Sequence, residues 1–276
     1  MSNIHVKKMT GACGAEVLGV NLASLSNSDM ETVRQAYVDH GVIFFRDQKI
    51  TPDEHIAFAR RWGDIVINKY FTPTENPLIA EVRKEKEQKT NIGGGWHTDH
   101  SYDADPAMGS ILVARQLPEE GGDTLFSSMY AAYDALSPGL KKTLEGMRAL
   151  HSTARAFGAA GFYQQTDQGG GMKVASEHPE VSHPVVITHP ESGRKALYVN
   201  AAFTTRFEGW TPMESQPLLD FLYRHAVQPE FTCRFRWEEG SIAFWDNRAT
   251  WHYAANDYHG HERLMHRITI KGVPLG

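Results

Sequence analysis

The chain contains the stretch Gly93-Gly94-Gly95-Trp96-His97-Thr98-Asp99, around which we expect the rest of the fold to be organised. This stretch places an imidazole and a carboxylate two residues apart. On an extended strand, side chains at positions i and i+2 point to the same face, so both can bind one ion. A second imidazole is available from the distant stretch Phe244-Trp245-Asp246-Asn247-Arg248-Ala249-Thr250-Trp251-His252. We predict that His97, Asp99 and His252 bind one metal ion.

Two histidines and one carboxylate on one face of an octahedron leave coordination positions open for an oxidant. This ligand set is typical of non-haem iron(II) oxygenases, so the predicted ion is Fe(II). Zinc also accepts histidine and carboxylate ligands and stays open as an alternative. The tripeptide His-x-Asp is weak support by itself, because the chain has 14 histidines and 33 acidic residues. The prediction therefore depends on the surrounding motifs.

The order of these motifs resembles the TauD/TfdA family, which includes taurine and 2,4-dichlorophenoxyacetate dioxygenases. The resemblance covers nearly the whole chain. The matching segments, in chain order, are residues 14–22, Gly41-Val42-Ile43-Phe44-Phe45-Arg46, Trp96-His97-Thr98-Asp99, Gly121-Gly122-Asp123-Thr124, Tyr198-Val199-Asn200, Phe203-Thr204-Thr205-Arg206, Trp245-Asp246-Asn247-Arg248, His252-Tyr253 and Arg263-Leu264-Met265-His266-Arg267.

The resemblance implies an Fe(II)-dependent dioxygenase that uses 2-oxoglutarate and O2 as co-substrates. In that family an arginine binds the far carboxylate of 2-oxoglutarate and a threonine assists it, and Arg263 and Thr124 match these positions. Arginine suits this role because its planar fork donates two parallel hydrogen bonds to a carboxylate. Without the resemblance, the same residues would be read as a surface arginine and a core threonine.

Arg267 follows Arg263 by four residues, so both would share one face of a regular strand. In relatives the second arginine binds the anionic group of the primary substrate, and we therefore expect a small anionic organic substrate. An ion pair with a nearby acidic residue is the alternative. Further candidates for substrate contact are Phe203, His100 and Asn68, with weaker ones at Phe71 and Phe157, and His266 is expected to be structural.

Two positions depart from the taurine dioxygenases. Those enzymes place a histidine near the position of Asn68 and an asparagine near that of Gly93, and both help to recognise taurine. Because neither is present, we expect a bulkier or more apolar acid than taurine, such as an aryloxyalkanoate, an alkyl sulfonate or a sulfate ester. Hydroxylation of a carbon that bears a heteroatom would then cleave the bond between them.

Composition limits the other classes of function. The net charge of −5 provides no basic excess to replace counterions, so we expect no binding to nucleic acid. No apolar run is long enough to span a bilayer, and residues 1–10 lack the pattern of a signal peptide. We therefore expect no membrane association and a cytoplasmic protein. Only Cys13 and Cys233 are present, and both are expected to be free, buried thiols.

Local patterns predict a mainly β protein with flanking helices. A capping box at Ser28 predicts a helix that ends at Gly41, and similar signals predict helices that begin after Thr51, Ser137 and Thr211. Residues 11–19 are expected to form turns, 84–90 a solvated loop and 151–171 a lid. Strands are expected at residues 3–8, 42–45, 78–83, 108–116, from 124, 185–188, 196–199, 231–237, 241–245 and 265–271.

We expect a single domain spanning residues 1–276, with no internal repeat or linker. Sequence pattern supports a two-sheet β-sandwich with helices outside. The resemblance implies the more specific double-stranded β-helix (jelly roll) with iron at its open end, and a homo-oligomer, dimer or tetramer. Two alternative functions remain: a metal-dependent hydrolase that uses the same three ligands, and a non-catalytic jelly roll that binds organic acids.

Overall fold

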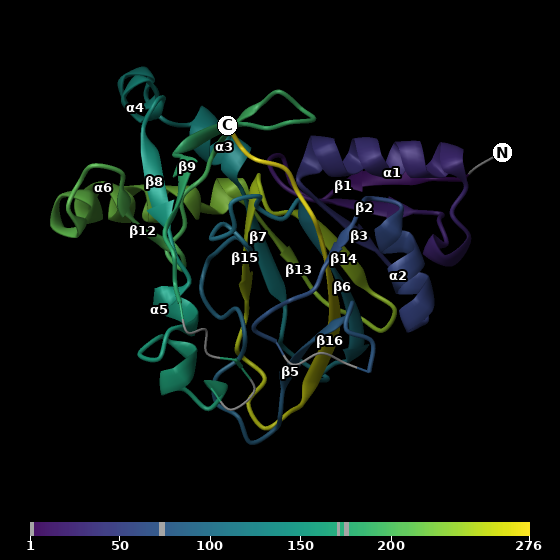
Figure 1. Ribbon diagram of the computed structural model, residues 1–276. Helices are drawn as coiled ribbons and strands as arrows, with labels where there is room; N and C mark the ends of the chain where they lie inside the picture. Colours follow the sequence, from purple (N-terminus) through teal and green to yellow (C-terminus); the bar gives the residue numbers. More distant parts are fainter. Residues whose placement is uncertain (1–2, 72–74, 170–171, 174–176) are drawn as a thin grey trace.

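The computed structural model describes residues 3–71, 75–169, 172–173 and 177–276. Its largest sheet has eight strands (Figure 1). In spatial order these are β1 (His5–Lys8), β2 (Ala15–Leu18), β3 (Val42–Phe45), β14 (Ile242–Asp246), β6 (Gly109–Gln116), β16 (Arg263–Ile270) and β4 (Ile65–Val66), with β5 (Ala80–Lys84) also paired to β16. Most of these pairs are antiparallel, and only β2 and β3 run parallel.

A second sheet contains β13 (Thr232–Phe235), β7 (Thr124–Ser128) and β15 (Thr250–Ala254) in that order. Two smaller antiparallel sheets extend the structure beside it. One contains β12 (Thr204–Phe207), β8 (Arg148–His151) and β9 (Val181–Pro184), and the other is the hairpin of β10 (Val186–Thr188) and β11 (Lys195–Leu197).

Aromatic side chains fill the space between the eight-stranded sheet and the β13-β7-β15 sheet. The ring of Phe44 stacks on Phe235 with centroids 4.1 Å apart and meets Phe126 edge-on at 5.4 Å. All three side chains are fully buried. Along β13 and its flanks, alternate residues point inward, as the period of two predicts. This core fixes the distance between the two sheets that carry the candidate site.

Two helices, α1 (Asn27–His40) and α2 (Pro52–Arg60), cover the other face of the large sheet (Figure 1). The side chain of Thr51 and that of Glu54 form a reciprocal capping box that starts α2. Gly41 ends α1 with a φ of 71°, a left-handed conformation that glycine adopts without steric cost. The remaining helices are α3 (Met129–Asp134), α4 (Pro138–Leu144), α5 (Ala154–Phe157), α6 (Pro212–Ala226), η1 (Leu22–Ser24), η2 (Tyr163–Gln165) and η4 (Pro229–Phe231).

Most expected elements are present, but three local predictions are wrong. The first helix is capped by Ser26 rather than Ser28, because the Ser26 hydroxyl accepts the hydrogen bond from the Asp29 amide. Residues 15–18 form β2 instead of turns, since they pair with β1 and β3. Lys84 ends β5 with only 1% of its surface exposed, although it was expected to open a solvated loop.

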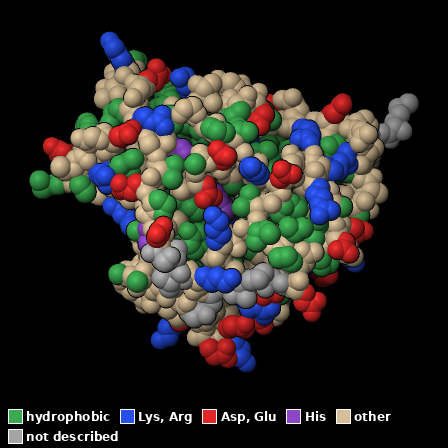
Figure 2. Space-filling model, in the orientation of Figure 1, with side chains coloured by type: hydrophobic (Ala, Val, Ile, Leu, Met, Phe, Trp, Pro, Cys, Tyr) green, Lys and Arg blue, Asp and Glu red, His purple; other side chains and the backbone are tan. Residues whose placement is uncertain are grey.

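Both cysteines are free and buried, as predicted. Within the described residues, no helix combines the length and apolarity required of a membrane-spanning segment. Figure 2 shows acidic and basic side chains interspersed over the visible face.

A buried ion network holds the turn between β14 and β15. Asp246 and Arg248 are each 1% exposed, and the Arg248 guanidinium donates to both carboxylate oxygens of Asp246 at 2.7 and 2.9 Å. His189 contacts the same carboxylate at 3.0 Å, and Glu191 accepts from Arg248. Burial would raise the pKa of Asp246, but the Arg248 charge holds it well below its usual range. The network sets the start of β15, which carries His252.

Lowering the pH should destabilise the fold, because buried histidines stay neutral in the folded protein and become protonated when the chain unfolds. His55 is fully buried, and burial together with the Arg115 charge lowers its pKa to about 3. An unfolded imidazole titrates near 6.5, so between these values the unfolded chain binds more protons and stability falls with falling pH. We expect His55→Leu to remove about 2 kcal/mol of the stability loss between pH 7.5 and pH 5.

Urea unfolding at pH 7.5, 6 and 5 measures this effect. The exposed His259, changed to Leu, is the matched control and should leave the pH dependence as in the parent. Parallel curves for His55→Leu and the parent would contradict the prediction.

Candidate metal centre

The structure brings His97, Asp99 and His252 together at the edge of the β13-β7-β15 sheet. Each offers one ligand atom, and these atoms lie within 4.8 Å of one another. The Nε2 atoms of His97 and His252 lie 3.7 and 3.9 Å from the two oxygens of Asp99. Among the residues that the structure describes, this is the only cluster of three or more histidine, cysteine or acidic side chains with such spacing.

The backbone pairs the two histidines directly. The His97 amide donates to the His252 carbonyl at 3.1 Å, and the His252 amide donates back at 2.8 Å. His252 belongs to β15, but His97 forms only this isolated antiparallel bridge and lies in no strand, so the expectation of a regular strand through His97 and Asp99 is wrong. The chain turns away immediately, since His100 has a φ of 59°. Asp99 approaches the histidines from an irregular loop.

The contacts of each imidazole favour metal binding through Nε2. The Nδ1 atom of His97 lies 2.7 Å from the Gly95 carbonyl oxygen, which requires a proton on Nδ1 and leaves Nε2 free to act as a ligand. Burial, followed by the charge of His97, lowers the pKa of His252 well below its ordinary value. Neutral imidazole is the form that coordinates metals.

Arginine, histidine and serine side chains surround the Asp99 carboxylate. Burial would raise its pKa, but the Arg267 charge, followed by His252 and His97, holds it well below its usual range. Arg267 lies 3.3 Å from both carboxylate oxygens, and the Ser110 hydroxyl donates to one of them at 3.0 Å. Asp99 is therefore an oriented anion rather than a neutral acid.

Glycine is required beside this cluster. Gly93 has a φ of 81°, and a Cβ there would lie 3.3 Å from Cε1 of His97. Its carbonyl accepts from the Ala254 amide at 2.9 Å, and its amide donates to the Tyr163 hydroxyl at 3.0 Å. The glycine-rich stretch thus packs its backbone directly against the candidate ligands and does not act only as a flexible connection.

Arg263 lies at the start of β16 and is 5% exposed. Its Nε and Nη2 atoms are buried and have no hydrogen-bond partner. A buried guanidinium without partners is costly unless a ligand supplies an acceptor. Thr124 is also buried, and its hydroxyl accepts from Nε1 of Trp237, whose ring lies 5.5 Å from the Arg263 guanidinium carbon. Both residues fit a carboxylate-binding role.

A cavity of about 350 Å³ opens beside the cluster. His97, Asp99 and Arg267 lie at its polar end, and most of the remaining wall is apolar or aromatic. That wall includes Phe71, Ile92, Tyr102, Ala156, Phe157, Phe162, Tyr163, Ala202 and Phe203, with Arg155 also at the lining.

Only some of the residues predicted to contact substrate line this cavity. Phe203, Phe71 and Phe157 line the cavity, whereas His100 and Asn68 do not. The Nδ1 atom of His100 contacts Asp103 at 2.8 Å, and the Asn68 side chain accepts from two backbone amides of its own turn. Residues 72–74, which follow Phe71, lie outside the described residues.

Sequence reasoning missed Tyr102 and Tyr163 as wall residues. Tyr102 follows the metal motif by three positions, a spacing that could have drawn attention to it. Tyr163 comes from the segment predicted to be a lid, of which residues 170–171 are outside the described part. Asp167 fastens that segment, because its carboxylate accepts from the amides of Lys89 and Thr90.

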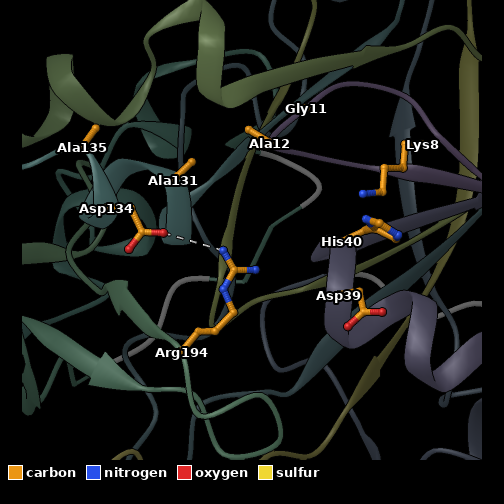
Figure 3. A pocket seen from close by; sticks show the side chains of 9 residues that line it. All are labelled: Lys8, Gly11, Ala12, Asp39, His40, Ala131, Asp134, Ala135 and Arg194. Carbon is orange, nitrogen blue, oxygen red and sulfur yellow. Dashed lines mark ion pairs between the residues drawn. The ribbon is translucent and has the colours of Figure 1, made fainter.

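A larger cavity of about 590 Å³ lies elsewhere, where Lys8 and His40 face Arg194 and Asp134 (Figure 3). Arg194 already pairs with Asp134 at 3.8 Å and lies over the ring of Tyr130 at 4.0 Å. None of the candidate metal ligands lines this cavity. Its charges compensate one another, so we assign the functional site to the smaller cavity.

Comparisons with known proteins identify the family of the chain. Residues 5–269 match the family described as Taurine catabolism dioxygenase TauD, TfdA family. The chain is 36% identical to an alkylsulfatase of Acinetobacter baylyi, covering 98% of this chain and 85% of that protein. It is 34% identical to an alpha-ketoglutarate-dependent sulfate ester dioxygenase of Pseudomonas putida, covering 99% and 91% of the two chains.

A solved structure gives the fold. The crystal structure of a putative alpha-ketoglutarate-dependent taurine dioxygenase from Burkholderia xenovorans superimposes with a TM-score of 0.83 at 34% identity, covering 98% of this chain and 93% of that one. The predicted double-stranded β-helix is thereby confirmed. The chain belongs to the TauD/TfdA family of 2-oxoglutarate-dependent dioxygenases and is an enzyme.

Proposed function

We propose that residues 1–276 form one catalytic domain that oxidises a small organic anion, with an alkyl sulfate ester as the favoured substrate class. The observation that carries this proposal is the position of Arg267. Its guanidinium lies beside the candidate metal ligands and also lines a mainly aromatic cavity. An anionic group bound there would hold its attached carbon chain against the apolar wall and near the metal.

Iron(II) is the ion we assign to His97, Asp99 and His252, because two histidines and one carboxylate leave open positions. With 2-oxoglutarate and O2, bound iron supplies the oxidant for C–H hydroxylation and releases succinate and CO2. The protein contributes an oriented carboxylate at Asp99 and a neutral imidazole at His252. Arg263 and Thr124 are assigned to the far carboxylate of 2-oxoglutarate, which would provide the acceptors that Arg263 lacks.

Arg267 is assigned to the acidic group of the primary substrate. It is 7% exposed, and its Nε atom has no hydrogen-bond partner. Its guanidinium carbon lies 4.7 Å from the ring of Phe71, which limits water at one side. Its contact with Asp99 uses Nη1, so the remaining donors are available to a planar or tetrahedral anion.

The wall opposite Arg267 supports an extended apolar substituent. Phe157 stacks on Tyr163 at 5.5 Å between ring centroids, and Tyr102 meets Phe203 edge-on at 4.8 Å. Burial of one methylene against such a wall contributes about 0.8 kcal/mol. A chain of several carbons therefore gains affinity here that a compact zwitterion such as taurine does not.

For a sulfate ester the reaction balances without a further reagent. Hydroxylation of the carbon attached to the ester oxygen gives an unstable product, R–CH(OH)–OSO3⁻. Its C–O bond to sulfate breaks, giving an aldehyde, sulfate and a proton. The names of the Acinetobacter and Pseudomonas relatives favour this class over sulfonates and aryloxyalkanoates. A zinc hydrolase with the same ligands would release sulfate without O2 and would form an alcohol.

The metal assignment predicts that His97→Ala lowers affinity for Fe(II) and Mn(II) by more than about a hundredfold, because one of three protein ligands is lost. Mn(II) titration without oxygen, followed by paramagnetic resonance, measures the affinity. The exposed His5, changed to Ala, is the matched control and should bind as the parent does. Equal affinity of His97→Ala and the parent would remove His97 from the site.

The substrate assignment predicts oxygen-dependent succinate formation that an alkyl sulfate stimulates. Protein reconstituted with Fe(II) would be assayed with alkyl sulfates, sulfonates and aryloxyalkanoates of matched chain length. We expect Arg267→Met to lower kcat/KM roughly 10- to 150-fold, the cost of about 1.5–3 kcal/mol for a charged hydrogen bond. Binding of 2-oxoglutarate should change much less.

The exposed Arg224, changed to Met, is the control for this substitution and should retain the kcat/KM of the parent. Sulfate release under nitrogen, with an alcohol as product, would contradict the dioxygenase and favour the hydrolase. Stimulation by sulfonates or aryloxyalkanoates but not by alkyl sulfates would keep the dioxygenase and correct the substrate class.

A further inference from the structure

Lys84 is a buried cation that the proposed reaction does not yet use. It is the last residue of β5, is 1% exposed, and its ammonium nitrogen has no hydrogen-bond partner. The nitrogen lies over the ring of Tyr258, 4.2 Å from its centroid, and the charge of Asp167 also acts on it without forming an ion pair. A cation over an aromatic face gains only about 0.5–2 kcal/mol, whereas burying an unpaired ammonium costs far more.

The sheet places Lys84 directly opposite Arg263. These two residues are register partners in the antiparallel pair of β5 and β16, so their side chains leave the sheet on the same face. Like charges at directly opposed positions are unfavourable. Arg263 is also buried and has two guanidinium nitrogens without partners. The protein thus holds two unneutralised cations next to each other.

Contacts around Gly122 indicate that the two side chains extend toward the same region. A Cβ on Gly122 would lie 3.2 Å from Cδ of Arg263 and 3.3 Å from Cδ1 of Tyr258, the ring that the Lys84 ammonium faces. Tyr258 is 4% exposed. The aromatic ring therefore contacts the region of both cations, and a ligand that meets Arg263 at this point lies close to Lys84.

The acidic residues whose charges act on this pair are Asp123 for Arg263 and Asp167 for Lys84, and both carboxylates already accept other hydrogen bonds. The carboxylate of Asp123 accepts from Nε of Arg234 at 2.6 Å. The carboxylate of Asp257 accepts from the Gly122 amide at 2.7 Å and lies 3.6 Å from Arg234. Within the described part of the chain, neither Lys84 nor Arg263 forms an ion pair with a carboxylate. A ligand carboxylate would supply the hydrogen-bond acceptor that Lys84 and two nitrogens of Arg263 lack.

We propose that Lys84 is the second cation of the 2-oxoglutarate site and donates a hydrogen bond to the far carboxylate that Arg263 binds. This inference rests on the proposed function, because it uses 2-oxoglutarate as the ligand. It adds a binding residue from β5 to the two assigned on β16 and β7. A carboxylate at this point would offset part of the charge of both cations and would accept hydrogen bonds from Lys84 as well as from Arg263 and Thr124.

Burial lowers the pKa of both Lys84 and Arg263, which is the direction expected when cations lose water without gaining an anion. A carboxylate between them would reverse that effect. Without a bound anion, the burial of the two cations has an electrostatic cost, and binding of the co-substrate carboxylate reduces that cost. Removal of the Lys84 charge should weaken binding without weakening the unliganded fold.

The test compares two keto acids on Mn(II)-loaded protein without oxygen, using titration calorimetry. 2-Oxoglutarate carries the far carboxylate, and 2-oxopentanoate has the same carbon chain without it. We expect Lys84→Met to weaken 2-oxoglutarate binding at least about tenfold and to change 2-oxopentanoate binding less than about threefold. Lys84→Arg should restore most of the affinity because it keeps the charge.

Lys86→Met is the matched control, since Lys86 is 68% exposed in the same segment, and it should bind both acids as the parent does. Thermal unfolding of the unliganded variants should show no loss of stability for Lys84→Met, and Lys84→Gln repeats the test if that variant does not fold. Unchanged 2-oxoglutarate affinity, or equal losses for both acids, would overturn the role of Lys84. A parent protein that binds no 2-oxoglutarate would overturn the proposed function itself.

Discussion

The site depends on keeping the Asp99 carboxylate ionised in a place where burial opposes its charge. The Arg267 guanidinium, two imidazoles and the Ser110 hydroxyl together offset that cost. An ionised carboxylate that Arg267 and Ser110 hold in place can act as a fixed ligand when a divalent cation binds. Arg267 therefore stabilises the Asp99 carboxylate and also lines the cavity in which we propose that the substrate anion lies.

The position of His252 follows from a second buried charge pair. Asp246 and Arg248 satisfy one another in the turn before β15, and the Asp246 amide donates to the carbonyl of Gly41 at 2.8 Å. Breaking such a pair from one side costs about 3–5 kcal/mol because it leaves a charge buried and uncompensated. The turn is thus held to α1 and to the β10–β11 hairpin, and β15 begins at a fixed point from which His252 meets His97.

The sequence was sufficient to predict an element where its capping residues and its hydrophobic period both lie within the element itself. Thr51 and Glu54 gave the start of α2, and the alternation from Phe231 to Trp237 gave the inward face of β13. The sequence was insufficient where an element depends on partner strands that are distant in the chain. β2 is a strand only because β1 and β3 pair with it, and β15 carries no period that distinguishes it from a loop. The residue types of the candidate metal ligands could be predicted from the sequence, but the irregular backbone path from His97 to Asp99 could not.

Lys84 shows this limit most clearly and also indicates how the site is built. A run of charged residues predicts solvent exposure, yet pairing with Arg263 draws its first member into the interior. Arg263 and Arg267 are separated by four residues of strand, about 13 Å along β16. One end of this stretch is then suited to a co-substrate carboxylate and the other to a substrate anion. Of these two arginines only Arg267 contacts the candidate metal ligand Asp99, so the stretch distinguishes a position beside the metal centre from one at the start of β16.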